Sequence, residues 1–265
     1  MEHQTKRLVL LLALISVFAS FSCNRQSSTS AGGGKGQITA AAAISLKDAF
    51  LKMADLYQKR SGDKVDFSFG SSGELMRQIE AGAPVDVFAS AGQREMNDLQ
   101  SKDLVDVETR ADFARNSLAI IVPAGSTLHL NSVADLAGTA VRRISIGDPK
   151  TVPAGMYAQQ LLVHEQLWKK LQPRLIFAEN VRQVLEYVAR EEVSAGIVYA
   201  TDVGIAHRKV QVAAHVPDGT YGPVLYPIAE IKGSTHQAAA REFVQFVLSP
   251  EGQHALQQFG FLPVK

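Results

Sequence analysis

Strand patterns and helix patterns alternate along most of this chain. In the clearest helix pattern, over 46–57, apolar residues recur every third or fourth position and so lie on one face. Strand patterns occur at 38–43, 65–69, 85–89, 118–122, 143–146 and 196–199, and further helix patterns at 155–168 and 181–190. Strands that alternate with helices of about 10–15 residues predict parallel β–α–β units, and therefore an α/β fold.

The length of the chain indicates that these strands and helices form two lobes rather than one. The chain has 265 residues, and a single doubly wound sheet of ~230 residues would be large. We therefore expect two lobes, each a mostly parallel sheet flanked by helices, joined by crossing strands at Asn116–Pro123 and Val224–Ile231. The expected boundaries are 37–117 for lobe 1, 118–225 for lobe 2 and 226–265 for the return to lobe 1. The last helix is expected to begin at Ser249-Pro250 and to end near Gly260.

Composition excludes several classes of function. The formal net charge is +1, and 20% of the residues are charged. A nucleic-acid-binding domain is usually strongly basic, so no nucleic-acid partner is expected. The hydrophobic content of 46% argues against both disorder and a multi-span membrane protein. A single cysteine forms neither an internal disulfide nor a cysteine-based zinc site.

Residues 1–22 have the pattern of an export signal. Lys6 and Arg7 precede an apolar run of 14 residues, which is shorter than the ~20 residues that span a bilayer. Residues 23–36 are rich in Ser and Gly and predict a flexible tether. Without its signal, the chain has 25 basic and 25 acidic residues.

The only cysteine, Cys23, directly follows this signal. Its position resembles a bacterial lipobox, in which the cysteine is lipidated and becomes the mature N-terminus, although Ser20 stands where leucine is usual. The alternative is an ordinary cleaved signal. We expect an exported protein that is periplasmic or on the outer face of the membrane, with a lipid anchor at Cys23.

Four turns that lead into predicted helices carry hydrogen-bond donors. They are the turn at Ser45, the turn at Gly70–Gly73, the turn at Asp148–Gly155 and the turn at Asn180-Val181. In an open α/β sheet such turns lie at the carboxyl ends of the strands, where ligands bind. Each helix start offers free N–H groups and a partial positive charge, so several together would form an anion site without Lys or Arg. Taken singly, the same residues are ordinary helix caps and tight turns.

The chain shows no enzyme motif. Gly70–Gly73 is not a nucleophile elbow, because Glu74 stands where that motif needs glycine. The histidines are scattered without an HExxH arrangement. We therefore expect binding without catalysis, with no cofactor and no free metal cation. The alternative is a secreted serine hydrolase with Ser72 as its nucleophile.

Read together, these turns resemble the molybdate-binding proteins of bacterial ABC transporters, which have the type II periplasmic-binding fold. The stretches that carry the resemblance are 42–46, 69–73 with 77–84, 147–149 with 152–158, and 196–199. The likeness extends from about Gln37 to the C-terminus. It implies a monomeric solute-binding protein that captures molybdate or tungstate between its lobes. The anion would then pass to an ABC permease with its cytoplasmic ATPase.

The same resemblance implies which residues hold the oxyanion. It places serine hydroxyls at Ser45 and Ser72, backbone N–H groups at Ala154 and Val181, and a tyrosine hydroxyl at Tyr199. The family commonly has alanine at the position of Ile44, and serine or threonine at the position of Gly73, so these two departures bear on selectivity.

A site made only of hydrogen-bond donors suits a tetrahedral dianion, whose oxygens only accept hydrogen bonds. Sulfate is too small to reach all of them, tungstate is nearly as large as molybdate, and protonated phosphate would leave its proton unpaired. The sequence does not rank molybdate over tungstate. Other ligands on the same fold would be sulfate, phosphate, an organic acid or ferric iron. An iron site usually needs adjacent tyrosines, whereas Ala200 follows Tyr199.

Overall fold

The computed structural model describes residues 36–206, 208–217 and 219–264. The expected export signal at 1–22, Cys23 and the tether up to residue 35 lie outside these residues. From Lys35 onward the chain forms one compact unit. No helix in the described part of the chain is long and apolar enough to span a membrane.

Five strands form the sheet of lobe 1. They are β1 (Gln37–Ala43), β2 (Lys64–Gly70), β3 (Val87–Ala89), β4 (Ala111–Asn116) and β10 (Val224–Glu230), in the order β2-β1-β3-β10-β4. β1 pairs in parallel with β2 and β3, whereas β10 is antiparallel to both β3 and β4. All strands except β10 therefore run in one direction, and the sheet is mostly parallel as expected.

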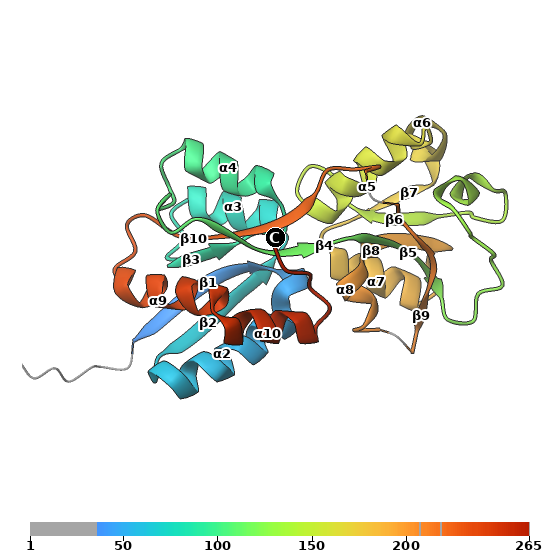
Figure 1. The fold of residues 1–265 in the computed structure, drawn as a ribbon. Helices are drawn as coiled ribbons and strands as arrows, with labels where there is room; N and C mark the ends of the chain where they lie inside the picture. Colours follow the sequence, from blue (N-terminus) through green and yellow to red (C-terminus); the bar gives the residue numbers. More distant parts are fainter. Residues whose placement is uncertain (1–35, 207, 218, 265) are drawn as a thin grey trace, which may run out of the picture. The chain divides into compact units, whose positions relative to one another are not determined.

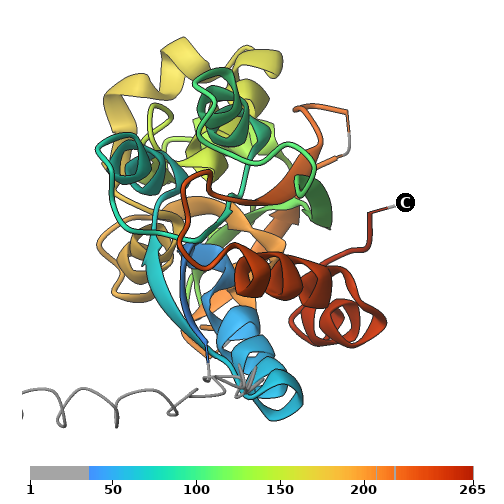
Figure 2. The same cartoon turned by 90° about the vertical axis from the view of Figure 1, so that its left-hand side faces the viewer.

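Helices cover both faces of this sheet (Figure 1). One face carries α2 (Lys47–Ser61), α9 (Gln237–Leu248) and α10 (Pro250–Gln258), and the other carries α3 (Ser72–Glu80) and α4 (Gln93–Ser101). Figure 2 shows α9 and α10, in red, packed beside α2, in blue. The alternation of side chains in β1 explains the two layers, because Ala40 shares a core with Phe50 of α2 while Ala41 shares another with Leu75 of α3.

The sheet of lobe 2 repeats this plan. Its strands are β5 (Leu118–Pro123), β6 (Ile144–Gly147), β7 (Leu175–Ala178), β8 (Ala195–Tyr199) and β9 (Val210–His215), in the order β7-β6-β8-β5-β9. Its helices are α5 (Pro153–His164) and α6 (Trp168–Leu171) on one face, and α7 (Val181–Ala189) and α8 (Ala200–Val203) on the other (Figure 1). β6 is parallel to β7 and β8, and β5 is antiparallel to β8 and β9. The expected two-lobe α/β fold is confirmed.

The chain passes between the lobes at two places. Asn116 ends β4 and Leu118 begins β5, so the first crossing lies at Ser117. The second lies between β9 and β10, before Val224. In each sheet, the one reversed strand is the strand that follows a crossing, namely β5 in lobe 2 and β10 in lobe 1.

Some element ends differ from the sequence prediction. The helix predicted over 155–168 stops at His164, because Gln166 takes a left-handed conformation with φ 57° and α6 starts anew at Trp168. The last helix begins at Pro250 with Ser249 as its cap, as predicted. The strands β4, β7 and β9 and the helices α4 and α9 were not predicted.

Candidate functional site

All the residues assigned from the sequence line one small cavity. Ser45 and Ser72 come from lobe 1, and Ala154, Val181 and Tyr199 come from lobe 2. The cavity lies where β1, β2, β6 and β8 end, the edge of each sheet at which ligands bind in open α/β folds. About 10 Å³ is open to the centre of a water molecule, close to the minimum for one water. None of the described residues that line this cavity is charged.

Ser72 does not cap the helix that it begins. Ser71 is the cap of α3, with its Oγ accepting from the N–H of Glu74 at 3.4 Å. The fully buried Ser72 instead accepts the N–H of Ala91 at 3.0 Å. A hydroxyl that accepts this bond keeps its own proton available for another acceptor.

Ser45 lies in a single 3-10 turn, Ile44–Leu46, between β1 and α2. Its side chain is 5% exposed and makes no capping bond. Its Oγ is 3.3 Å from the Tyr226 hydroxyl. Here too the serine is not an ordinary helix cap.

The first turn of α5 presents the N–H of Ala154. Pro153 occupies the first helical position, and no side chain caps this end of the helix. Gly155 allows the helix to approach β6 closely, because a Cβ at this position would lie 2.0 Å from the carbonyl oxygen of Gly147. Asn180 caps α7 by accepting from the N–H of Gln183 at 3.0 Å, which leaves Val181 as the first helical residue.

Tyr199 makes a hydrogen bond between the lobes. Its hydroxyl is buried and donates to the carbonyl oxygen of Ala91 at 3.0 Å. Burial strongly raises the pKa of Tyr199, so the group keeps its proton. Tyr199 has one O–H, so it must break its bond to Ala91 before it donates to an anion.

Ala91 is a site residue that the sequence analysis missed. It follows β3 and is held through its N–H by Ser72 and through its carbonyl by Tyr199. The predicted strand at 85–89 was the available signal, since the carboxyl end of that strand points to the same edge of the sheet as the predicted turns.

Two other contacts join the lobes beside the cavity. The N–H of Gly73 donates to the carbonyl oxygen of Thr151 at 2.9 Å. The guanidinium of Arg94 donates to the carbonyl oxygens of Pro149 at 3.1 Å and Lys150 at 3.0 Å. The turn that leads into α5 is thus held against lobe 1 by several hydrogen bonds.

Two arginines near the cavity, Arg94 and Arg182, are paired with carboxylates. Arg94 lies 2.7 Å from the buried Glu95, whose pKa is raised by burial. Arg182 joins Asp48 of lobe 1, at 2.6 Å, to Asp202 of lobe 2, at 2.9 Å. Burial raises the pKa of Asp202 to about 6, and Arg182 opposes that rise. These cations are therefore balanced by carboxylates.

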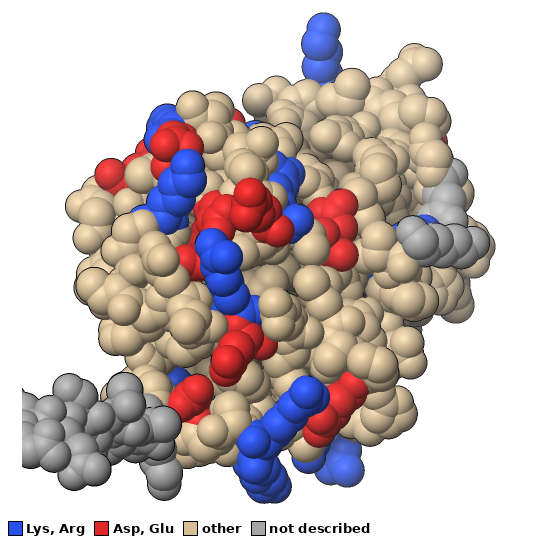
Figure 3. All heavy atoms as spheres, turned by 60° about the vertical axis from the view of Figure 1, so that its left-hand side comes forward, with Lys and Arg blue, Asp and Glu red and all other residues tan. Residues whose placement is uncertain are grey.

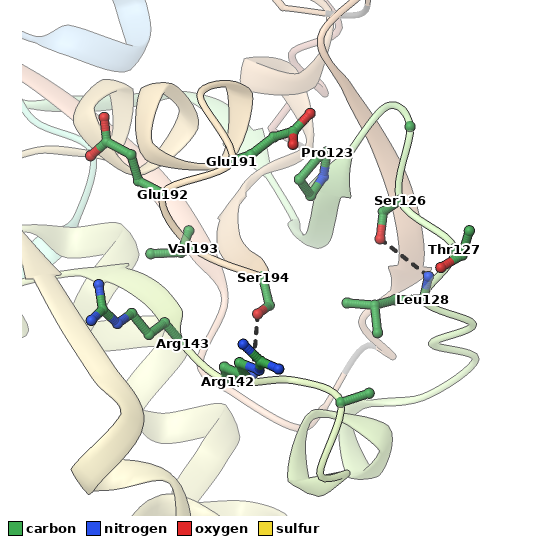
Figure 4. Close-up of a pocket in the computed structure, with 12 residues that line it drawn as sticks. Pro123, Ser126, Thr127, Leu128, Arg142, Arg143, Glu191, Glu192, Val193 and Ser194 are labelled. Atoms are coloured by element: carbon green, nitrogen blue, oxygen red, sulfur yellow. Dashed lines mark hydrogen bonds between the residues drawn. The ribbon is translucent and has the colours of Figure 1, made fainter.

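A larger hollow, of about 490 Å³, adjoins the small cavity and shares Ile44 and Asn180 with it. Two others lie farther away. A pocket of about 520 Å³ lies at the amino ends of β6 and β8, and Arg142, Arg143, Glu191 and Glu192 are among the residues that line it (Figure 4). Another, of about 610 Å³, lies at the amino end of β1 around Asp86. Both are at the opposite edge of a sheet from the predicted turns. On the face drawn in Figure 3, basic and acidic side chains lie interspersed.

A two-lobe α/β fold that brings donors from both lobes to one cavity defines a solute-binding protein. Residues 38–262 match the bacterial extracellular solute-binding protein family, and the chain belongs to that family. The molybdate-binding protein ModA of Haemophilus influenzae is 37% identical over 231 residues, which cover 85% of this chain and 89% of that protein.

Two further matches also have names that describe binding proteins. The putative ABC transporter substrate-binding lipoprotein YvgL of Bacillus subtilis is 29% identical over 254 residues, 96% of each chain. The structure of the periplasmic molybdate-binding protein of Azotobacter vinelandii matches with a TM-score of 0.78 and 25% identity, over 86% of this chain and all of the other.

Proposed function

We propose that this protein binds molybdate or tungstate outside the cytoplasm and delivers it to an ABC importer. The observation that carries the proposal is the cavity at which Ser45 and Ser72 of lobe 1 meet Ala154, Val181 and Tyr199 of lobe 2. These groups are neutral hydroxyls and N–H groups at helix starts, the donors that a tetrahedral dianion needs. The 37% identity to a molybdate-binding protein supports the choice of ligand.

The energetics of such a site are sufficient without a cationic side chain. A hydrogen bond to a charged group contributes about 1.5–3 kcal/mol, so five of them contribute about 7.5–15 kcal/mol, a range that includes the ~8 kcal/mol of micromolar affinity. The cavity is close to the minimum volume for one water, so it must widen before an oxyanion fits, which a separation of the lobes would allow. The crossings at Ser117 and before Val224 are the places where the chain would bend.

Calorimetric titration with molybdate, tungstate, sulfate and phosphate tests the proposal. Ser72→Ala is expected to weaken molybdate binding roughly 10- to 100-fold, the loss of one hydrogen bond to a charged group. The matched control is Ser145→Ala, because Ser145 is also buried but donates to the carbonyl of Ile176, outside the cavity. Sulfate binding as tight as molybdate binding would refute the selectivity, and no oxyanion binding would refute the function.

We further propose that binding is not coupled to catalysis and that the protein uses no cofactor and no resident metal cation, with molybdenum present only in the bound anion. A serine hydrolase would need a base beside Ser72. In the described part of the chain, the hydroxyl of Ser72 accepts from the backbone of Ala91, and no histidine lines the cavity.

Export, with lipidation at Cys23, completes the proposal. The relative YvgL is named a lipoprotein, and its alignment takes in 96% of this chain. A lipid-anchored monomer would hold its cavity near the membrane, where a permease with a cytoplasmic ATPase would receive the anion.

A further inference from the structure

A buried chain of hydrogen bonds lies behind Ser45. Tyr226, on β10, is fully buried and does not line the cavity. Its hydroxyl lies 3.3 Å from Ser45 Oγ and 3.1 Å from Nδ2 of Asn116, the last residue of β4. The same Nδ2 also donates to the hydroxyl of Thr201, in lobe 2, at 2.9 Å. This series of hydrogen bonds thus extends from the first crossing between the lobes to the cavity.

The direction of these hydrogen bonds follows from Asn116. Its Oδ1 accepts from the N–H of Ser117 at 2.9 Å, which fixes the orientation of the amide and directs both Nδ2 hydrogens to Tyr226 and Thr201. The Tyr226 oxygen is therefore an acceptor for Asn116, and its own proton needs another acceptor.

Ser45 supplies that acceptor. Burial raises the pKa of Tyr226, so its hydroxyl remains protonated and able to donate. If Ser45 donated instead, Tyr226 would accept from both neighbours and leave a buried O–H without a partner, which is unfavourable. With Tyr226 as donor, Ser45 uses a lone pair on it and keeps its own proton for the cavity.

We propose that Asn116 and Tyr226 are positioning residues that make Ser45 a donor toward the bound anion. This inference rests on the proposed oxyanion function and adds a basis for selectivity. A serine held as a donor suits molybdate, which only accepts hydrogen bonds. The bond from Tyr226 takes one of the two lone pairs of Ser45 Oγ, which favours donation to molybdate over acceptance of the proton of hydrogen phosphate. Without Tyr226, both lone pairs of Ser45 are free to accept.

A double-mutant cycle tests this inference. Molybdate and phosphate affinities are measured by calorimetry at pH 7 for the unaltered protein, Tyr226→Phe, Ser45→Ala and the double variant. Tyr226→Phe is expected to weaken molybdate binding roughly 10-fold, while phosphate binding falls less or rises. In the Ser45→Ala background, Tyr226→Phe is expected to have no further effect, because its action passes through Ser45.

Tyr157→Phe is the matched control. Tyr157 is also buried and donates to the carbonyl of Pro223 at 3.3 Å, but it does not contact Ser45 or line the cavity. Removal of the Tyr157 hydroxyl is expected to leave the ratio of molybdate to phosphate affinity unchanged. Thermal unfolding shows whether each variant folds. If Tyr226→Phe does not, Asn116→Ala is expected to give the same dependence on Ser45.

The outcomes separate this inference from the proposed function. Suppose that the unaltered protein binds molybdate and that Tyr226→Phe weakens binding equally in the unaltered and the Ser45→Ala backgrounds. The inference about Tyr226 is then overturned, while the proposed function stands. The same holds if Tyr226→Phe leaves both affinities unchanged. If the unaltered protein binds no molybdate, the proposed function falls and the inference with it.

Discussion

Gly73 limits how closely the two lobes approach each other. It is the second residue of α3, and its N–H donates across the lobes to the carbonyl oxygen of Thr151 at 2.9 Å. A Cβ at this position would lie 2.6 Å from the same oxygen and 2.8 Å from the Cα of Thr151. Both contacts are to backbone atoms, so no side-chain rotation relieves them. Gly73→Ala therefore holds the turn before α5 away from lobe 1.

The size of the effect follows from these distances. An ordinary contact needs about 3.4 Å, so Thr151 must retreat by about 0.8 Å and its bond to Gly73 lengthens from 2.9 Å to about 3.7 Å, beyond hydrogen-bond range. That loss costs about 1 kcal/mol, and displacement of the Ala154 N–H from the anion costs about 1.5 kcal/mol more. Together they predict a roughly 70-fold weaker affinity for molybdate.

Calorimetry with molybdate, paired with thermal unfolding of the ligand-free protein, measures this effect. Alanine is a better helix former than glycine, so stability should stay level or rise while affinity falls. Gly125→Ala is the control, since a Cβ there would meet no atom within 4 Å and Gly125 does not line the cavity. If Gly73→Ala binds molybdate as tightly as Gly125→Ala does, the lobes do not need this close approach and the reasoning is wrong.

Three other predictions follow from separate parts of the molecule. Gly155→Ala places a Cβ 2.0 Å from the Gly147 carbonyl, so urea unfolding should show a loss of at least about 2 kcal/mol together with weaker anion binding. Because burial raises the pKa of Asp202 to about 6, the folded protein takes up this proton more readily than the unfolded chain between about pH 4 and 6. The unfolding free energy should therefore fall by up to about 3 kcal/mol as pH rises through that window, and Asp202→Asn should remove this dependence. Cys23→Ser should release the protein from the membrane fraction.

Each of these has an outcome that contradicts it. Normal stability of Gly155→Ala would mean that α5 moves away from β6 without cost. Equal pH dependence for Asp202→Asn and the unaltered protein, measured by urea unfolding at pH 4 and pH 7, would place the pKa of Asp202 near its ordinary value. Unchanged membrane fractionation of Cys23→Ser would argue for an ordinary cleaved signal.

The fold was largely predictable because its central strands are buried on both faces. Segment 118–122 is a continuous apolar run in the sequence and is wholly buried as part of β5. The strands β7 and β9 lie at the edges of their sheet and have several exposed positions, so their patterns are weaker. The break after His164 depends on one residue with positive φ, which periodicity does not reveal.

The cavity was predictable in part. Ser45, Ser72 and Ala154 sit in turns whose local sequence carries the resemblance, and the structure brings these turns to one place. Ala91 contributes only backbone groups, which any residue has, so its own sequence carries no signal. Tyr226 reaches Ser45 only because β10 returns to lobe 1 after the second crossing. Such a partnership is a property of the tertiary fold.

The bond from Tyr199 to Ala91 has a consequence for transport. It holds the lobes together with protein atoms alone, as do the bonds from Gly73 to Thr151 and from Arg94 to Pro149. Contacts of this kind lower the free energy of closure and so raise the affinity for any ligand enclosed. They also reduce the share of closure that the ligand controls, since a ligand shifts a conformational equilibrium only by its differential affinity. In the proposed function, Tyr199 would serve both demands, because its single O–H donates either to Ala91 or to the anion. The loaded and the unloaded protein would then differ in which atom accepts this hydrogen bond, a difference that the proposed permease would sense through the lobes.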